Sequence, residues 1–389
     1  MNVPKLRFKE FNDEWSFAKL SEISSNISYG MGLASKEYDG INKYIRITDI
    51  DETTSKYSNN DIVSPDGELE EKYLVNTNDI LFARTGASTG KTYLYDEQDG
   101  KLYFAGFLIR ANIINHDANF IFQQTKTNKY NKWVKIMSMR SGQPGINSQE
   151  YGSYKFSIAS PKEEEKISKT LKLLDKKIEL QTKKIEDLKL FKKGFFSSQI
   201  KKTSNNKIRI KDILTEVNDK TSTNNEYDII SSTSNGIFLQ KEYFNKQAAS
   251  ENNIGYKILR KNQLVLSPQN LWLGNINVNY KYDIGIVSPS YKIFTINTKV
   301  INMDFLNFWI TTPRALYDYM ISSEQGASIV RRNLNMELFS EIVINTPSLE
   351  IQNIIGKNLA NFDKKILLET NKLEKLIKLK KGLMQNMFV

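Results

Sequence analysis

A glycine-rich run, Gly86-Ala87-Ser88-Thr89-Gly90-Lys91-Thr92, is the first place in the chain where residue types and spacing could do chemistry. Its composition is that of a phosphate-binding loop, in which backbone amides and a lysine surround the phosphates of a nucleotide. That loop needs four residues between its glycines, and here there are three. The next residues, Tyr93-Leu94-Tyr95, favour a strand instead of the helix whose N-terminus the phosphate requires. A nucleotide-binding enzyme is therefore kept only as the alternative interpretation of this loop.

The same segment can instead contact nucleic acid. Arg84 and Thr85 directly follow an expected strand, residues 79–83, and precede glycines that permit close approach of the backbone. Arginine can bind two acceptors of guanine in the major groove, while small hydroxyls and backbone amides suit phosphates. A connecting turn in which Arg84 is merely solvated is the other interpretation. The first loop thus offers Arg84, Thr85, Ser88 and Lys91 as DNA contacts.

A second polar cluster, Arg140-Ser141-Gly142-Gln143-Pro144-Gly145-Ile146-Asn147, follows a helix expected near residues 128–139. In the second half of the chain, Gln269-Asn270-Leu271-Trp272 takes the place of the first loop, and Arg331-Arg332-Asn333 that of the second. Glutamine and asparagine can bind adenine, so different loops in equivalent places predict that two different short sequences are read. The expected DNA-binding residues are Arg84, Thr85, Ser88, Lys91, Arg140, Ser141, Gln143, Gln269, Asn270, Trp272, Arg331, Arg332 and Asn333.

Composition excludes several classes of catalytic and metal site. The 389 residues include no cysteine and one histidine, His116, which excludes disulfides, thiolate catalysis and zinc sites built on sulfur or on two imidazoles. We expect His116 to be a solvated loop residue and no residue of this chain to bind a metal. No methyltransferase signature of the Asn-Pro-Pro-Tyr or Asp-Pro-Pro-Tyr type is present, and no apolar run approaches the roughly 18 residues of a membrane span. The sequence predicts a cytoplasmic protein with no membrane contact, whose associated catalysis belongs to a partner.

Positive charge is concentrated in two segments that are copies of each other. The net charge is +11; residues 161–202 carry 13 lysines against seven acids and residues 347–389 carry eight against four, so these segments hold +10 of it. The motif Asp175-Lys176-Lys177-Ile178 recurs as Asp363-Lys364-Lys365-Ile366, which gives a period of 188 residues. A period this long is far beyond that of solenoid repeats and indicates a tandem domain duplication.

Each Lys-rich segment predicts a long helix with apolar residues spaced four and three apart. Pro161 and Pro347 open the segments, and acidic residues follow, as the first turn of a helix prefers. The spacing is that of a coiled-coil heptad, interrupted at matched positions by polar residues. We expect the two helices to pair antiparallel, although a helix packed on its own globule would show a similar seam. The seam residues are Leu171, Leu174, Ile178, Gln181, Ile185 and Leu188, and Leu359, Phe362, Ile366, Glu369, Leu373 and Leu376.

The regions between the helices predict two globules of the α+β class. Short apolar runs indicate strands, and longer amphipathic runs indicate helices. Strands are expected near residues 44–47, 79–83, 107–110, 263–266 and 291–294, and helices near residues 128–139 and 303–320. The resulting domain order is a globule at residues 1–160, a helical region at 161–202, a globule at 203–346 and a helical region at 347–389. Strand order within the globules does not follow from the sequence.

On these motifs the chain resembles the specificity subunit of type I restriction-modification enzymes. The resemblance rests on residues 79–88, on residues 141–147 and on the helix openings at Pro161 and Pro347. It implies two tandem α/β target-recognition domains, each reading one half of a bipartite double-stranded DNA target, that alternate with two long helices paired as an antiparallel coiled coil. The helices would set the unspecified spacer and dock two modification (methyltransferase) subunits. Restriction (endonuclease and translocase) subunits would join that core.

The resemblance also implies a non-catalytic subunit with no cofactor of its own. S-adenosylmethionine, Mg²⁺ and ATP would belong to the partner subunits. The second globule departs from the motif, because Ser267-Pro268-Gln269-Asn270 stands where the first has Arg84-Thr85-Gly86-Ala87, so base-reading residues transfer poorly there. A self-assembling coiled-coil protein, which would oligomerise without a partner and show no DNA preference, is a third hypothesis.

Overall fold

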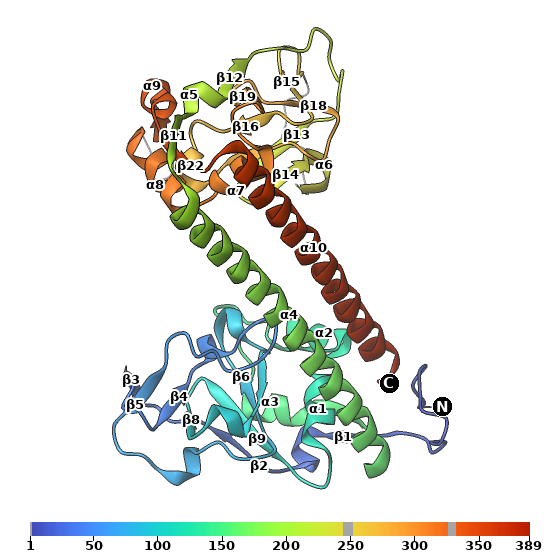
Figure 1. Cartoon of the computed structure of the whole chain (residues 1–389). Coiled ribbons are helices and arrows are strands. Elements are labelled where there is room, and N and C mark those ends of the chain that lie inside the picture. Colours follow the sequence, from blue (N-terminus) through green and yellow to red (C-terminus); the bar gives the residue numbers. More distant parts are fainter. Residues whose placement is uncertain (1, 244–251, 326–331) are drawn as a thin grey trace. The chain divides into compact units, whose positions relative to one another are not determined.

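The computed structural model describes residues 2–243, 252–325 and 332–389 (Figure 1). The chain divides into two compact units, which we call unit 1 (Met1–Thr182 with Asn371–Val389) and unit 2 (Lys183–Thr370). Both divisions fall inside long helices, and they fall at equivalent positions of the 188-residue repeat. Each unit contains helices and strands, which confirms the α+β class.

Unit 1 is built around a four-stranded antiparallel sheet in the order β2-β9-β6-β7. Strand β6 is buried at every position because its alternate side chains enter two different cores, Ile80 and Phe82 on one face and Leu81 and Ala83 on the other. The smaller sheets pair β1 with β10, β3 with β5 and, in parallel, β4 with β8. The strands are β1 Ser16–Lys19, β2 Ser24–Tyr29, β3 Ala34–Glu37, β4 Lys43–Ile45, β5 Val63–Asp66, β6 Asp79–Ala83, β7 Thr92–Leu94, β8 Leu102–Phe104, β9 Leu108–Ile113 and β10 Lys155–Ile158, and the short helices are α1 Ala118–Gln124, α2 Asn128–Met137 and α3 Ser148–Ser153.

Unit 2 repeats this sheet, with strands in the order β12-β19-β16-β17. Strand β16 divides its side chains in the same way, with Leu264 and Leu266 in the larger core and Val265 in the smaller one. The strands are β11 Asn206–Arg209, β12 Leu214–Val217, β13 Ile230–Thr233, β14 Gly236–Leu239, β15 Lys257–Arg260, β16 Leu264–Leu266, β17 Ile276–Val278, β18 Ile284–Val287, β19 Lys292–Ile296, β20 Ser323–Gln325, β21 Arg332–Leu334 and β22 Val343–Thr346, and the short helices are α5 Ile210–Ile213, α6 Gln240–Tyr243, α7 Met303–Trp309, α8 Pro313–Ile321 and α9 Met336–Ser340.

Three short helices in each unit begin with equivalent N-caps, which supports the duplication. In each case the side-chain oxygen of the cap accepts a hydrogen bond from a backbone amide in the first turn, as polar caps do. The cap pairs are Asp117 and Asn302 for α1 and α7, Thr127 and Thr312 for α2 and α8, and Asn147 and Asn335 for α3 and α9. The structure corrects one expectation here. The single helix expected near residues 303–320 is two helices, because Thr312 caps a new helix whose first residue is Pro313.

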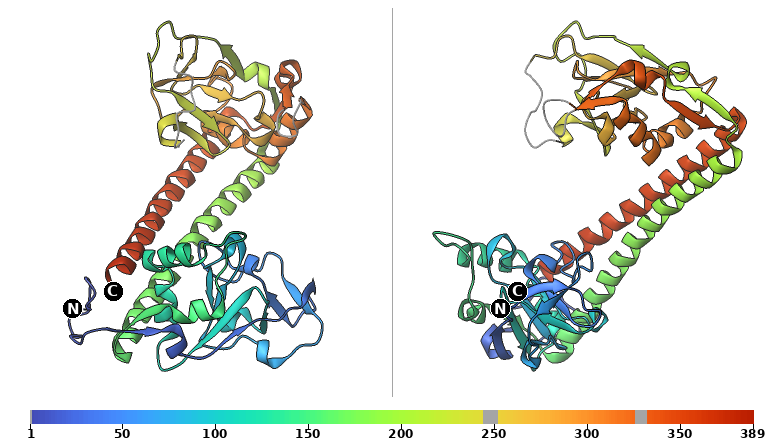
Figure 2. Two further views of the ribbon diagram at one scale, coloured as in Figure 1. Left: turned by 180° about the vertical axis from the view of Figure 1, so that it is seen from behind. Right: turned by 90° about the vertical axis from the view of Figure 1, so that its left-hand side faces the viewer.

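The two long helices, α4 Pro161–Thr203 and α10 Leu349–Asn386, pair antiparallel within each unit (Figures 1 and 2). In unit 1, Lys380 Nζ lies 2.5 Å from an oxygen of Asp175. In unit 2, Lys192 Nζ lies 2.6 Å from an oxygen of Asp363. These are the same two repeat positions, so each helix supplies the lysine in one unit and the aspartate in the other. This exchange requires the antiparallel pairing.

The predicted seam residues of both helices are buried or half-buried. The polar seam residue Glu369 is 5% exposed, and its carboxylate oxygen lies 3.1 Å from Lys184 Nζ. This ion pair offsets the cost of burying the carboxylate charge. The beginning of each long helix also packs on a globule. Ile167 and Leu171 enter the core of unit 1, and Ile355 and Leu359 enter that of unit 2. Pairing with the other helix and packing on a globule, which were alternatives for the seam, therefore occur together.

Candidate nucleic-acid interface

The loop between β6 and β7 is a hairpin in which several backbone amides already donate to protein carbonyl oxygens. A 3₁₀ turn, Gly86–Ser88, is followed by strand β7 and not by a helix. Four loop amides donate to protein carbonyl oxygens at 2.9–3.1 Å: Gly86 to Pro144 (2.9 Å), Thr89 to Gly86 (3.1 Å), Gly90 to Ala83 (2.9 Å) and Lys91 to Ser88 (3.0 Å). Amides committed to carbonyls are not available to surround a phosphate, so this geometry gives no support to the nucleotide-binding alternative.

The two polar loops that the sequence singles out are hydrogen-bonded to each other in both units. In unit 1, Ile146 N donates to Arg84 O at 2.9 Å, and Thr85 forms a β-bridge with Gly145. In unit 2, Arg332 N donates to Gln269 O at 3.1 Å. The equivalence of the loops that was predicted from the repeat is thus a physical pairing at the end of the central sheet. We call each pair of loops the joined loops.

Arg84 is half-buried and held in place, not merely solvated. Its guanidinium carbon lies 4.9 Å from the centre of the Tyr29 ring, a cation–π distance. The Tyr29 hydroxyl accepts a hydrogen bond from Ser148 N at 3.0 Å, at the start of α3. Beneath this site the buried hydroxyl of Tyr151 donates to Ala83 O at 2.7 Å, and burial raises the pKa of this hydroxyl. The end of β6 is therefore fixed on both sides of the arginine.

An arginine is held over an aromatic ring at the joined loops of unit 2 as well. The guanidinium carbon of Arg332 lies 5.0 Å from the centre of the Trp272 ring, and its Nη1 lies 3.5 Å from Met320 O. In unit 1 the arginine comes from the first loop, whereas in unit 2 it comes from the second. The arrangement recurs although the residues that build it differ.

The other predicted residues of unit 1 differ in what their side chains do. Ser141 and Gln143 are exposed, and Ser88 is half-buried. Gln143 covers Gly86, which has a positive φ of +68° and whose missing Cβ would lie 2.8 Å from Gln143 Nε2. The Arg140 side chain is engaged in contacts within the protein. It pairs with Glu150 at 2.5 Å and donates to two carbonyl oxygens at the end of α2.

Lys91 does not join Arg84. Ala83 N donates to Lys91 O, so Lys91 pairs with Ala83, and side chains of a strand alternate between faces. Lys91 and Arg84 are therefore on opposite faces of the sheet. Hydrogen bonds from Thr54 and, to a smaller extent, the charge of Lys91 lower the pKa of Asp51. Lys91 therefore lies toward the loop that contains Asp51.

The remaining predicted residues of unit 2 are Gln269, Asn270, Arg331 and Asn333. Gln269 is exposed and Asn270 is half-buried, and the backbone carbonyl of Asn270 accepts the amides of Leu273 and Asn275. Asn333 is exposed in β21. Arg331 lies outside the described residues.

A buried anchor at the start of each long helix was not predicted. Glu164, in the first turn of α4, is fully buried and accepts the amides of Asp117 (3.1 Å) and Ala159 (3.2 Å). His116 Nδ1 lies 3.1 Å from the same carboxylate, and its side chain is 19% exposed. The expectation that His116 is a solvated loop residue is wrong, because the loop turns it toward this carboxylate.

Gln352 repeats the anchor in unit 2. Its Oε1 accepts the amide of Asn302 at 2.9 Å, and its Nε2 donates to Pro347 O at 3.0 Å. Glu164 and Gln352 are equivalent positions of the repeat, as are the caps that they bind. The sequence gives one signal for this anchor, a polar residue at the same position in the first turn of both long helices. A solvated polar residue in a first turn looks the same in a sequence.

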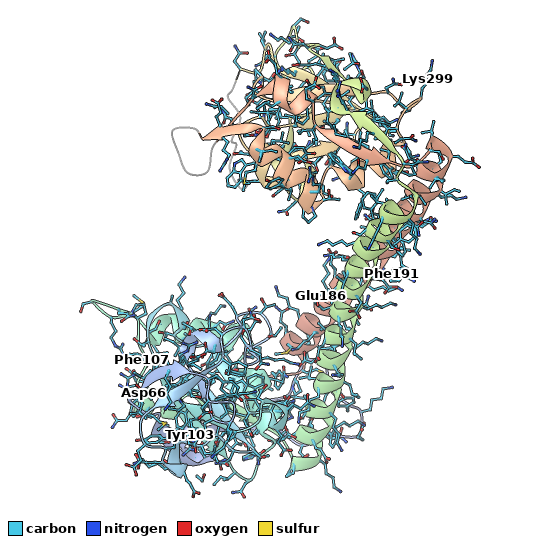
Figure 3. The ribbon with its side chains drawn as sticks, turned by 60° about the vertical axis from the view of Figure 1, so that its left-hand side comes forward. Asp66, Tyr103, Phe107, Glu186, Phe191 and Lys299 are labelled. Atoms are coloured by element: carbon cyan, nitrogen blue, oxygen red, sulfur yellow. The ribbon has the colours of Figure 1, made fainter. Side chains whose placement is uncertain are left out.

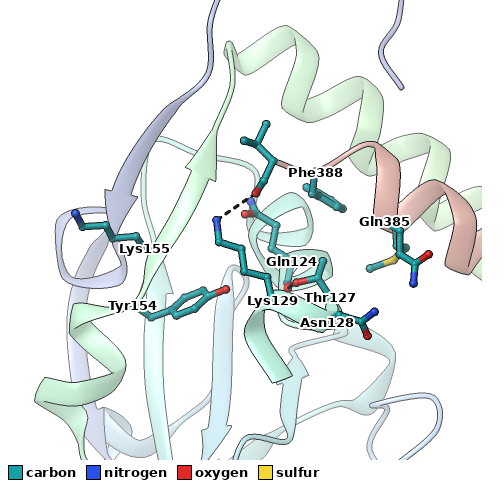
Figure 4. A pocket seen from close by; sticks show the side chains of 10 residues that line it. Gln124, Thr127, Asn128, Lys129, Tyr154, Lys155, Gln385 and Phe388 are labelled. Carbon is teal, nitrogen blue, oxygen red and sulfur yellow. Dashed lines mark hydrogen bonds between the residues drawn. The ribbon is translucent and has the colours of Figure 1, made fainter. Parts of the chain in front are cut away.

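A pocket in unit 1 lies where the end of α10 meets the start of α2 (Figure 4). Lys129 Nζ donates to Val389 O at 3.2 Å across it. Its lining residues are Gln124, Thr127, Asn128, Lys129, Tyr154, Lys155, Met384, Gln385, Phe388 and Val389. Among the described residues, no group of three or more histidine, aspartate or glutamate side chains could hold a metal ion, and no helix is long and apolar enough to cross a membrane.

Comparison with known proteins points to one family. Residues 12–190 match the family model of the type I restriction modification DNA specificity domain. The fold is similar to that of the S subunit of the type I restriction-modification system from M. genitalium, with a TM-score of 0.62 and 13% identity over 100% of this chain and 99% of that one. A chain from a structural study of complex assembly and conformational transition of the type I R-M system matches with a TM-score of 0.52 and 13% identity over 96% of this chain and 97% of its own. At this identity the likeness is one of fold, and it confirms tandem domains alternating with paired helices.

Proposed function

We propose that this chain is the sequence-reading subunit of a type I restriction-modification complex. The premise is that residues 12–190 match the model of the type I restriction modification DNA specificity domain, and that the fold is similar to that of an S subunit over the whole length of the chain. Each unit would read one half of a bipartite duplex target. The observation that carries this proposal is the arginine held over an aromatic ring at the joined loops of both units, Arg84 on Tyr29 and Arg332 on Trp272. A guanidinium in a fixed orientation suits bidentate binding of guanine.

Under this proposal the chain performs no chemical step. Adenine methylation with S-adenosylmethionine, and DNA cleavage and translocation with Mg²⁺ and ATP, would take place in modification and restriction subunits in the cytoplasm. The contribution of this chain is to select the DNA and to hold those subunits.

The decisive experiment compares genome-wide adenine methylation in the host with and without this gene. We expect one two-part motif to lose its methylation, and the motif would give both half-sites and the spacer. Persistence of every methylated two-part motif in the deletion strain would refute the proposal.

Exposed apolar side chains on the long helices support the docking of two modification subunits. Leu180 and Leu379 are 55% and 52% exposed in unit 1, and the equivalent Leu368 and Phe191 are 53% and 62% exposed in unit 2. Figure 3 shows Phe191 on α4. Exposed apolar surface can mark a site of protein–protein interaction. Each unit would therefore present one copy of the same docking site.

This arrangement predicts separable loss of the two modification subunits. Replacing Leu180 and Leu379 together by lysine should release one modification subunit, because a buried ammonium group without a partner disfavours the interface. Native mass spectrometry of the purified complex measures the stoichiometry. Replacing Lys172 by alanine, also exposed on α4, should leave two subunits bound, and two subunits on the double variant would contradict the assignment.

A further inference from the structure

An exposed phenylalanine stands beside Arg84 at the joined loops of unit 1. Phe107 is 57% exposed, although its neighbours Leu108 and Ile109 are fully buried. It lies in the tight turn between β8 and β9, where Leu108 N donates to Ala105 O at 2.8 Å. Figure 3 marks its position in unit 1. The ring is therefore accessible to a binding partner.

The strand register puts Phe107 and Arg84 directly opposite each other. Strands β6 and β9 pair Phe82 with Ile109 and Ala83 with Leu108, and the next pair in this register is Arg84 with Phe107. A hydrogen bond from Arg84 N to Phe107 O at 3.0 Å shows that the pairing continues. Residues directly opposite in an antiparallel pair share a face, with their Cβ atoms roughly 5 Å apart.

Tyr29 belongs to the same face of the sheet. Tyr29 is paired with Ile109 in β9, and Ile109 is paired with Phe82 in β6, so these residues form one row across the sheet. Phe107 is two residues from Ile109, and Arg84 is two residues from Phe82. Since alternate residues of a strand share a face, the side chains of Tyr29, Phe107 and Arg84 are on one face. The row of Phe82 and Ile109 is buried in the core of unit 1. One row further along, this face opens to solvent and presents a stacked arginine with an aromatic ring next to it.

The turn that carries Phe107 is held firmly. A Cβ on Gly106 would lie 3.0 Å from Met31 O, and one on Gly30 would lie 2.4 Å from Phe104 O and Ala105 O, so the two backbones are in close contact. A side chain on such a turn is presented in a defined place, as a specific contact requires. In unit 2, Leu273, which follows Trp272 in the chain, is 44% exposed.

We propose that Phe107 contacts the 5-methyl group of a thymine in the half-site read by unit 1, within about one base-pair step of the guanine bound by Arg84. Guanine O6 and N7 and the thymine methyl group all lie in the major groove, so one face of the protein can reach both. The separation of roughly 5 Å between the two side-chain origins is comparable with the 3.4 Å between successive base pairs. This inference rests on the proposed function and names one chemical feature of the target.

The test uses the full chain in complex with its modification subunits and a duplex that carries the methylated motif. Each thymine of the half-site read by unit 1 is replaced in turn by deoxyuridine, which lacks only the methyl group, and dissociation constants are measured by fluorescence anisotropy. For the wild type we expect one position to weaken binding by roughly three- to tenfold, the range set by loss of one buried methyl contact. For Phe107→Ala, binding to the thymine duplex should weaken by a similar factor, and deoxyuridine at that position should have no further effect.

Two controls separate this outcome from its alternatives. Ile41→Ala removes a side chain in unit 1 that is 67% exposed, and it should keep the wild-type response to deoxyuridine. Thermal unfolding of Phe107→Ala should match that of the wild type, because the ring is exposed. Equal deoxyuridine effects in the wild type and Phe107→Ala, or none at any position in the wild type, would overturn the thymine contact while leaving the sequence-reading function standing. A wild-type complex with no preference for any bipartite duplex would instead remove the proposed function itself.

Discussion

Under the proposed function, an arginine that is stacked on an aromatic ring has lost much of its side-chain freedom before it binds DNA. Ordering a long side chain on binding costs about 0.5–1.5 kcal/mol, so the stacks on Tyr29 and Trp272 transfer this cost from binding to folding. Arg84 comes from the first joined loop and Arg332 from the second. The two units therefore conserve the arrangement of an arginine on a ring, while the residue positions that supply it have changed.

Removing the Arg84 side chain should weaken target binding and relax base choice at one position. Arg84→Ala should cost about 1–3 kcal/mol, the range for one bidentate base contact. Arg84→Lys should not restore the loss, because an ammonium group cannot make the paired contact. Binding of the complex to duplexes with each base at each half-site position measures both effects. An unchanged base preference in Arg84→Ala would show that this arginine contacts only the backbone.

Lys126 predicts a dependence of stability on pH. Its ammonium nitrogen donates to Thr92 Oγ1 at 2.9 Å and to Ser55 Oγ, and lies 4.2 Å from the centre of the Phe122 ring. Burial, and in smaller part the charge of Lys380, lowers its pKa from the ordinary 10.5 to about 7. Between these values the unfolded chain holds the proton and the folded chain does not, so the free energy of unfolding rises with pH from about 7 to about 10.5.

Lys126→Met should remove this contribution. Urea unfolding of the wild type and the variant at pH 7 and pH 9 gives the difference, and the wild type should gain more stability than the variant on going to pH 9. Lys132→Met, at an exposed position of α2, should behave as the wild type does. The same gain in Lys126→Met as in the wild type would contradict a neutral Lys126.

At the scale of secondary-structure elements, each long helix is fixed to a globule by one buried polar side chain in its first turn. Glu164 binds the amide of the α1 cap residue, Asp117, and Gln352 binds that of the α7 cap residue, Asn302. The cap amide and the long helix are thereby joined by a hydrogen bond that no water can replace in a buried site. This bond sets where the helix begins relative to its globule.

The anchor predicts that two adjacent glutamates differ greatly in importance. Glu164→Ala should lower the free energy of unfolding by about 1–3 kcal/mol, because it leaves the amides of Asp117 and Ala159 without an acceptor. Glu165→Ala should change it by less than about 0.5 kcal/mol, because that side chain is 56% exposed and forms a surface ion pair with Lys169. Chemical denaturation of the two variants tests this, and equal effects would rule out the anchor.

The long helices could be predicted well from the sequence, since apolar spacing over many turns is a strong local signal. The expected helical region at residues 161–202 is close to the observed α4, Pro161–Thr203. The break between α7 and α8 was missed although Thr312 and Pro313 are a typical cap and first residue. Their signal was outweighed by an apolar pattern that continues through both helices.

The joined loops were located from the sequence, but their internal contacts were not. The repeat places both loops in both units, whereas the stack of Arg84 on Tyr29 joins residues 55 positions apart through the order of β2, β9 and β6. Strand order depends on non-local pairing, which spacing along the chain does not encode. The separation of Lys91 from Arg84 depends on the register of the β6–β7 hairpin, and Arg140 pairs with Glu150 ten positions further on; neither contact is specified by residue spacing alone.

At the scale of the whole molecule, we expect the paired helices to determine the length of the unspecified DNA spacer. Inserting one heptad after Thr182 and another after Thr370, which are equivalent positions, adds about 10 Å to each helix and preserves the seam. The spacer should then grow by up to about three base pairs at 3.4 Å each, with both half-sites unchanged. Methylation mapping of the variant reads out the spacer. A heptad in one helix alone should disturb the spacing of the two domains, and an unchanged spacer with both insertions would refute the role of the helices.

Unit 2 is one continuous stretch, Lys183–Thr370, whereas unit 1 needs Asn371–Val389 as well as Met1–Thr182. The last helix brings Met384, Met387 and Phe388 into its core, where the Phe388 ring lies 5.3 Å from that of Phe120. A ribosome makes these residues only after the whole of unit 2, roughly 10 to 40 s later at 5–20 residues per second. Part of the apolar core of unit 1 therefore stays uncovered after all the residues of unit 2 have been synthesised. We expect chaperones to bind unit 1 during synthesis of the chain. We also expect unit 1 to be the last part of the chain to finish folding.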